Sequence, residues 1–133
     1  MATTRIFNPA EIHKPVGYSH VAEVTSGKIV YISGQVALDP AGNLVGAGDF
    51  RAQTEQVFAN LAAAIQAAGT DFSRVVKLNC YCVDSVDPGE IATFRQVRDK
   101  FVNVANPPAS TFVVIRRLVR PEWLIEVEAV CVA

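Results

Sequence analysis

The sequence of 133 residues predicts a single α+β domain, spanning residues 1–133, in which two helices cover one face of a single mixed sheet. Its length matches one domain, since domains cluster at roughly 100–150 residues. Half of the residues are apolar, which supplies a core and argues against disorder. Segments with strand and helix periodicity also follow one another in the order strands, helix, strand, helix, two strands.

The first third of the chain predicts two strands. Residues 19–25 and 28–33 read as strands that flank Ser26-Gly27, a pair typical of a hairpin turn. Residues 39–43 then form a cluster of turn-favouring residues. We therefore expect a hairpin followed by a turn before the first helix.

A helix is expected from residue 49 or 50 to residue 68. Its apolar positions recur with a period of 3.6: Val57, Leu61, Ile65 and Ala68. Gly69 stands where a C-terminal cap is expected.

Residues 75–83 predict a strand with Cys80 and Cys82 on the face that points into the core. The chain has three cysteines, and an odd number argues against a disulfide framework. A metal site is not expected either, because His13 and His20 lie far away in the sequence.

The second helix is expected to open at Asp87-Pro88 and to end at residues 106–108. Its apolar stripe is Ile91, Phe94, Val97 and Phe101. Two final strands, residues 110–117 and 123–132, are expected to form a hairpin around residues 119–121.

The last strand has two different faces. One face is wholly apolar and is assigned to the helix side: Trp123, Ile125, Val127, Ala129 and Cys131. The other face mixes apolar residues with Glu126 and Glu128. Such a mixture suits a subunit interface that contains a polar pocket. The alternative is a mixed solvent face on which Arg116 pairs with one of the two glutamates.

Charge and hydropathy exclude several classes of function. Twelve basic and thirteen acidic residues give a net charge of −1, so a nucleic-acid partner is not expected. No apolar run approaches the roughly 18 residues of a membrane span, and no signal peptide is evident. We therefore expect a cytoplasmic protein, and its high apolar content favours self-association.

Four short motifs follow one another along the chain: Gly17-Tyr18-Ser19-His20, Ile32-Ser33-Gly34-Gln35 with the turn at 39–45, the helix at 53–71, and residues 124–130. They resemble, at matching spacing, motifs of the YjgF/Rid family, which are G-P-Y-S-Q, S-G-Q with D-P-x-T-G, a helix containing Q-x-x-x-x-x-x-N-L, and a closing V-x-I-E-A. The resemblance covers nearly the whole chain. It implies a chorismate-mutase-like fold and a homotrimer with a barrel-like core. It also implies small-molecule clefts between subunits, with no metal and no organic cofactor.

Deaminating members of this family hydrolyse enamines or imines. Carried over from the resemblance, Tyr18 lines the cleft, Ser33 and Gly34 supply backbone groups, and Glu126 positions water. The family's arginine, which grips the substrate carboxylate, is replaced here by Ser110. Losing such a charge-assisted contact costs about 1.5–3 kcal/mol, so the usual substrate specificity is not expected.

Other residues have two interpretations each. Arg95 can replace the missing anchor or pair with Asp99 on the helix surface. Arg116 offers a second candidate cation. Phe112 can narrow the cleft or simply pack in the barrel, and Tyr18 can pack in an interface.

Three functions follow. The first is hydrolytic deamination of an enamine or imine by a trimer of non-standard specificity. The second is a small-molecule-binding or accessory protein without this chemistry, which the serine at position 110 favours. The third, endoribonuclease or translation inhibitor activity, fits the charge balance least.

Overall fold

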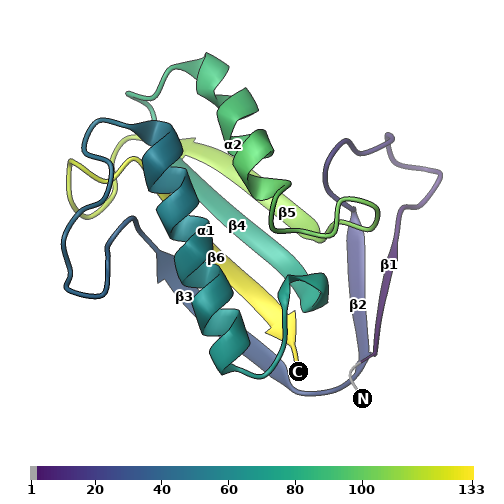
Figure 1. The fold of residues 1–133 in the computed structure, drawn as a ribbon. Coiled ribbons are helices and arrows are strands. Elements are labelled where there is room, and N and C mark those ends of the chain that lie inside the picture. Colours follow the sequence, from purple (N-terminus) through teal and green to yellow (C-terminus); the bar gives the residue numbers. More distant parts are fainter. Residues whose placement is uncertain (1–2) are drawn as a thin grey trace.

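A computed structural model describes residues 3–133 and confirms the α+β class (Figure 1). Its strands are β1 (Thr3–Phe7), β2 (Val21–Ser26), β3 (Ile29–Gln35), β4 (Val75–Val83), β5 (Ala109–Ile115) and β6 (Ile125–Val132). Its helices are α1 (Phe50–Ala67) and α2 (Ile91–Arg98), with short 3-10 turns at η1 (Phe72–Arg74) and η2 (Pro88–Glu90). Both helices lie on one face of a mixed four-stranded sheet.

The sheet has the strand order β3-β6-β4-β5, in which β4 and β5 are parallel and the other pairs antiparallel. The predicted final hairpin is therefore wrong, because β4 lies between β5 and β6. The connection over residues 116–124 is long enough to pass across one strand. Adjacency in sequence did not give adjacency in the sheet.

The first two strands form a second, two-stranded sheet of their own, with order β1-β2. The predicted hairpin between residues 19–25 and 28–33 is also wrong, because β2 pairs with β1 and β3 pairs with β6. Gly27, between β2 and β3, has φ +109°, a conformation that glycine adopts without strain. Strand β1 is short and was not expected from the sequence.

Helix α1 has the boundaries that its sequence predicts. Asp49 caps its N-terminus, where the side chain accepts a hydrogen bond of 3.0 Å from Ala52 N. Gly69 follows the last turn with φ +84°. Of the predicted apolar stripe, Val57, Leu61 and Ile65 are completely buried, whereas Ala68 is half-buried.

Two polar residues of α1 hold loops in place. The buried Gln53 donates to Gly46 O (3.1 Å) and Glu122 O (3.0 Å) and accepts from Leu124 N (2.9 Å). One side chain thereby satisfies three backbone groups on two separate loops.

Asn60 lies two turns further along α1 and also binds a loop. Its side-chain amide donates to Val36 O (3.1 Å) and to Leu38 O (2.9 Å). These bonds hold the irregular segment just after β3, residues 36–38.

Helix α2 is shorter than predicted. Asp87 caps the turn before it by accepting from Gly89 N at 2.7 Å, as expected. The helix ends at Arg98 rather than at residues 106–108. Beyond it Lys100 N bonds to Val97 O and Phe101 N bonds to Arg98 O, so the last turn tightens into three-residue spacing.

The three cysteines are buried free thiols, and Cys80 and Cys82 face the core as predicted. Burial raises the pKa of the Cys80 thiol to about 12 and that of Cys82 to about 11. Among the described residues, no helix is long and apolar enough to cross a bilayer.

Candidate functional site

The face of the sheet that turns away from the helices carries a carboxylate pair on β6. Glu126 and Glu128 alternate there with core residues and lie in register with Tyr81 and Asn79 of β4. Tyr81 donates from its hydroxyl to Glu128 Oε1 (3.0 Å), and Asn79 donates from Nδ2 to Glu128 Oε2 (3.3 Å). The bond to Glu128 raises the pKa of Tyr81. Glu128 is therefore held by its neighbours.

Glu126 has no such hydrogen-bond partner among residues 3–133. Burial, and then the charge of Glu128, raise the pKa of the Glu126 carboxyl above its ordinary value. Within residues 3–133 the only ion pairs are Arg5–Glu23 and Arg98–Asp99. The alternative that Arg116 pairs with a glutamate of β6 is therefore wrong for this chain, and Glu126 keeps a carboxylate without a cation.

Gly34 lies directly against Glu126. The pairing of β3 with β6 is interrupted between Ile32 and Gln35, which places the backbone of Ser33 and Gly34 beside the carboxylate. A Cβ at position 34 would lie only 2.1 Å from Glu126 Oε1. The structure thus brings together three predicted site residues: Ser33, Gly34 and Glu126.

A second group of predicted residues lies between α2 and β5. A cavity of about 380 Å³ opens there and is lined by Val16, Tyr18, Ile91, Phe94, Arg95, Arg98, Ser110, Thr111 and Phe112. It gathers four of the predicted site residues, namely Tyr18, Arg95, Ser110 and Phe112. They come from a loop, a helix and a strand that are far apart in the sequence.

The two groups face opposite sides of the sheet within one chain. Ser110 lies in register with the core residue Leu78 of β4 and lines the cavity beside α2. The Phe112 ring meets the Phe94 ring of α2 at 4.8 Å. Both side chains therefore point toward the helices, whereas Glu126 points away from them. The register agrees, because Phe112 pairs with the core residue Cys80 of β4, whereas Glu126 alternates with the core residues of β6.

Arg98 is the lining residue that sequence reasoning missed. It is buried, with 8% exposure, and both Nε and Nη2 lie 2.9 Å from Asp99 Oδ1. Gly17 packs onto it, since a Cβ there would lie 2.5 Å from Nη2. Its position three residues after Arg95, on one side of α2, is the only sequence signal.

Arg95 is exposed at the mouth of the same cavity. Because Asp99 bonds to Arg98, the expected pairing of Arg95 with Asp99 does not form. Arg95 is thus the cavity's cation without a carboxylate partner among residues 3–133.

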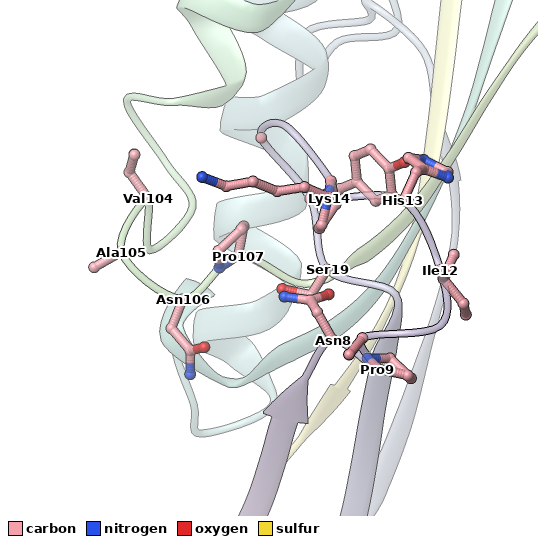
Figure 2. Close-up of a pocket in the computed structure, with 14 residues that line it drawn as sticks. Asn8, Pro9, Ile12, His13, Lys14, Ser19, Val104, Ala105, Asn106 and Pro107 are labelled. Carbon is pink, nitrogen blue, oxygen red and sulfur yellow. The ribbon is translucent and has the colours of Figure 1, made fainter.

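A larger cavity of about 620 Å³ lies between the N-terminal loop and residues 104–107 (Figure 2). His13 Nε2 lies 2.9 Å from the Tyr18 hydroxyl, and His20 Nε2 donates to His13 O at 2.7 Å. Tyr18 lines both cavities. His20 is a hydrogen-bonded loop residue, and Lys14 extends toward Val104.

A family model described as Endoribonuclease L-PSP matches residues 9–133, and the structure resembles solved members of the Rid family. The chain belongs to the YjgF/Rid family. Its fold accordingly matches that of the Rid-family protein YyfB from Yersinia pestis, with 38% identity, coverage of 98% of both chains and a TM-score of 0.90.

Further relatives place the chain among named proteins of the family. RidA from an Antarctic Psychrobacter is 30% identical, covers 97% of this chain and 99% of its own, and has a TM-score of 0.70. Protein DfrA of Myxococcus xanthus is 36% identical over 90% of this chain and 88% of its own length. A protein of Dermatophagoides farinae named 2-iminobutanoate/2-iminopropanoate deaminase is 34% identical over 61% of this chain and 62% of its own.

Proposed function

We propose that the protein hydrolyses a small imine or enamine that bears a negative charge, and that it releases ammonia. The observation that carries this proposal is the cavity between α2 and β5, where Tyr18, Ser110 and Phe112 meet the free guanidinium of Arg95. The cavity has the size of a small metabolite, and a planar guanidinium binds a carboxylate through two parallel hydrogen bonds. The name of the Dermatophagoides relative supports the reaction class.

In this mechanism Arg95 takes the anchoring role that Ser110 cannot fill. Arg98 does not compete for the ligand, because its guanidinium is bound to Asp99. It instead holds the loop at Gly17, and so positions Tyr18. Arg95 reaches the cavity from a helix rather than from β5. We therefore expect an anion bound by Arg95 to lie close to α2. An arginine at position 110 would instead hold the anion close to β5.

Glu126 activates the water molecule that attacks the imine. A half-buried carboxylate beside the Gly34 backbone accepts a proton from a water molecule and orients it toward the imine carbon. Water adds across the C=N bond to give a carbinolamine. In the carbinolamine the nitrogen carries the proton that Glu126 took from the water. The C–N bond then breaks as the hydroxyl proton passes through Glu126 to the nitrogen, so that ammonia and a carbonyl product leave.

The two groups of residues must meet for this chemistry to occur. Since they face opposite sides of one sheet, the proposal requires a second copy of the chain, as in the homotrimer expected from the sequence. Glu126, Ser33 and Gly34 of one protomer then face the cavity of its neighbour. We propose that the active cleft lies between subunits.

Ammonia release from an enzymatically generated 2-aminoacrylate-type imine tests the proposal. We expect turnover by the wild type above the uncatalysed rate, and a loss of about 10²-fold or more in kcat for Glu126→Gln. Glu128→Gln is the matched control on the same strand and should retain more activity. Equal rates for wild type and Glu126→Gln would refute the role of Glu126.

Arg95 is tested separately. Arg95→Ala should raise KM by roughly 10-fold or more through loss of a charge-assisted contact, with a smaller effect on kcat. Arg120→Ala removes an exposed arginine far from the cavity and is expected to change neither constant. An unchanged KM in Arg95→Ala would show that another group binds the anion.

One observation favours a second candidate, a binding protein without hydrolysis. Ser110 stands at the position of the arginine that grips the substrate carboxylate in deaminating members of the family, and one hydroxyl cannot replace a charged two-point anchor. In that case ligand binding would persist while ammonia release stayed at the uncatalysed rate.

A further inference from the structure

The outer edge of β3 is open. Strand β3 lies at one end of the sheet, and within residues 3–133 it pairs only with β6. Tyr31 and Ile29 on this edge strand are 79% and 48% exposed. A long apolar strand with an unpaired edge is a template for another strand.

The β1–β2 hairpin stands at the opposite end of the molecule, beyond β5 (Figure 1). Just before β2, Ser19 N donates to Pro108 O at 3.0 Å and Ser19 forms a parallel bridge with Ala109. These contacts hold the hairpin beside β5. The side of β2 that faces away from β1 has no partner strand in the described chain.

The connection between β2 and β3 is only Gly27-Lys28, a length that ordinarily joins two strands of one hairpin. Here the strands belong to different sheets. Lys28 N donates to Ala133 O (2.8 Å) and Ala133 N donates to Lys28 O (2.9 Å), which fixes the start of β3 to the C-terminus. A short connection that does not fold back is the geometry of an exchanged segment.

We propose that the β1–β2 hairpin of one copy completes the sheet of the next copy by pairing β2 with the open edge of β3. Each copy then offers a hairpin at one end and receives one at the other. This contact is heterologous, and it closes into a ring when the rotation between copies permits. The exchange would leave neither β2 nor β3 with an open edge.

The exchange also explains how the site is assembled, a consequence that rests on the proposed function. In an antiparallel pair the start of β2 lies opposite the end of β3. Tyr18, three residues before β2, therefore arrives near Ser33 and Gly34 of the neighbour. The cavity at Ser110 of one copy is thereby joined to Glu126 of the next.

Cysteine crosslinking between chains tests the exchange without any assay of catalysis. Val24→Cys or Thr25→Cys, one for each face of β2, is introduced in a chain carrying a mass tag. Ile29→Cys, Tyr31→Cys or Ser33→Cys is introduced in an untagged chain, and the two are co-expressed and oxidised. We expect at least one pair to give a reducible heterodimer at the mixed mass.

Val119→Cys, exposed in the loop between β5 and β6, replaces the β3 cysteine as the matched control and should give no such band. Absence of a heterodimer for every β2–β3 pair would overturn the exchange. A third chain carries both the β2 and the β3 cysteine. If its disulfide forms only within single chains and never between two chains, the exchange is also overturned.

Subunit complementation tests the composite site. Chains with Tyr18→Phe and chains with Glu126→Gln, each impaired alone, are co-assembled and assayed for ammonia release from the 2-aminoacrylate-type imine. Recovery of activity supports a site built from two copies, because only then does a mixed oligomer hold intact sites. No recovery, where wild type is active, overturns it. If the wild type itself is inactive, the proposed function fails, while the crosslink still decides the exchange.

Discussion

At the scale of single residues, the contact between Gly34 and Glu126 determines where the carboxylate lies. A methyl group at position 34 would lie 2.1 Å from Glu126 Oε1, so the side chain of Glu126 must move to admit it. Neither Gly34 nor Glu126 alone indicates where the carboxylate lies. Together they place the Glu126 carboxylate against the backbone at position 34, where a side chain would displace it.

Gly34→Ala should therefore impair catalysis more than binding. We expect a fall in kcat with KM nearly unchanged, and destabilisation of about 1–3 kcal/mol from overpacking. Steady-state kinetics combined with urea denaturation separates these effects. A variant with full kcat would show that the position of the Glu126 carboxylate does not matter for the reaction.

The raised pKa of Glu126 gives a pH dependence of stability. Because the folded state holds the proton more tightly than the unfolded chain, the stabilisation is complete below the ordinary glutamate pKa. It is lost as pH rises through the higher folded pKa. Glu126→Gln lacks this loss, so its stability relative to wild type should increase from acid to neutral pH. Denaturation curves that stay equally separated across this range would contradict the shift.

The activity should respond in the opposite direction. An ionised Glu126 is needed to accept the proton from water, so kcat of the wild type should fall on the acid side. The apparent pKa of this limb should lie above the ordinary glutamate value. A pH–rate profile that is flat through this range would show that Glu126 does not titrate in the rate-limiting step.

The site residues that could be predicted from the sequence are those that occupy a fixed position in a motif. Ser33, Gly34 and Glu126 lie together, as do Tyr18, Ser110 and Phe112. Arg98 could not be found in this way. Its burial depends on Gly17 and Asp99, and arginine is ordinarily exposed.

At the scale of elements, α1 organises the loops as well as the core. Gln53 and Asn60, the two polar residues of the helix motif, bind backbone groups of surrounding segments. Their place in the motif is thus explained by structure rather than by chemistry at the site. A buried amide with three backbone partners leaves all three unpaired when it is removed.

Gln53→Ala should accordingly destabilise the fold by about 3 kcal/mol, because Gly46 O, Glu122 O and Leu124 N lose their partner. Gln66→Ala, at an exposed position of the same helix, is the matched control and should change stability by less than about 0.5 kcal/mol. Urea denaturation measures both. Similar values for the two variants would contradict the role of Gln53.

The elements show why some of the fold is readable from sequence and some is not. Helix α1 and strand β4 follow their predicted bounds, since caps and periodicity are local signals. The pairing of β2 with β1 and of β5 with β4 was missed, because strand pairing is decided by contacts between distant segments. The early end of α2 was missed because no proline or glycine marks it.

At the scale of the whole molecule, the two halves of the proposed site lie on opposite faces of one sheet. The separate β1–β2 hairpin stands at one end, and the open edge of β3 lies at the other. These features are complementary between copies rather than within one copy. The oligomer is thus part of the proposed catalytic unit, and the monomer alone holds two incomplete sites.

The central claim is that this cleft hydrolyses an imine although serine replaces the usual arginine. The most direct measurement is ammonia release from an enzymatically generated 2-aminoacrylate-type imine, by wild type and Ser110→Arg side by side. We predict that the wild type is clearly faster than the uncatalysed reaction, because Arg95 already binds the carboxylate. A wild type no faster than the uncatalysed reaction, whether or not Ser110→Arg is active, would contradict the account.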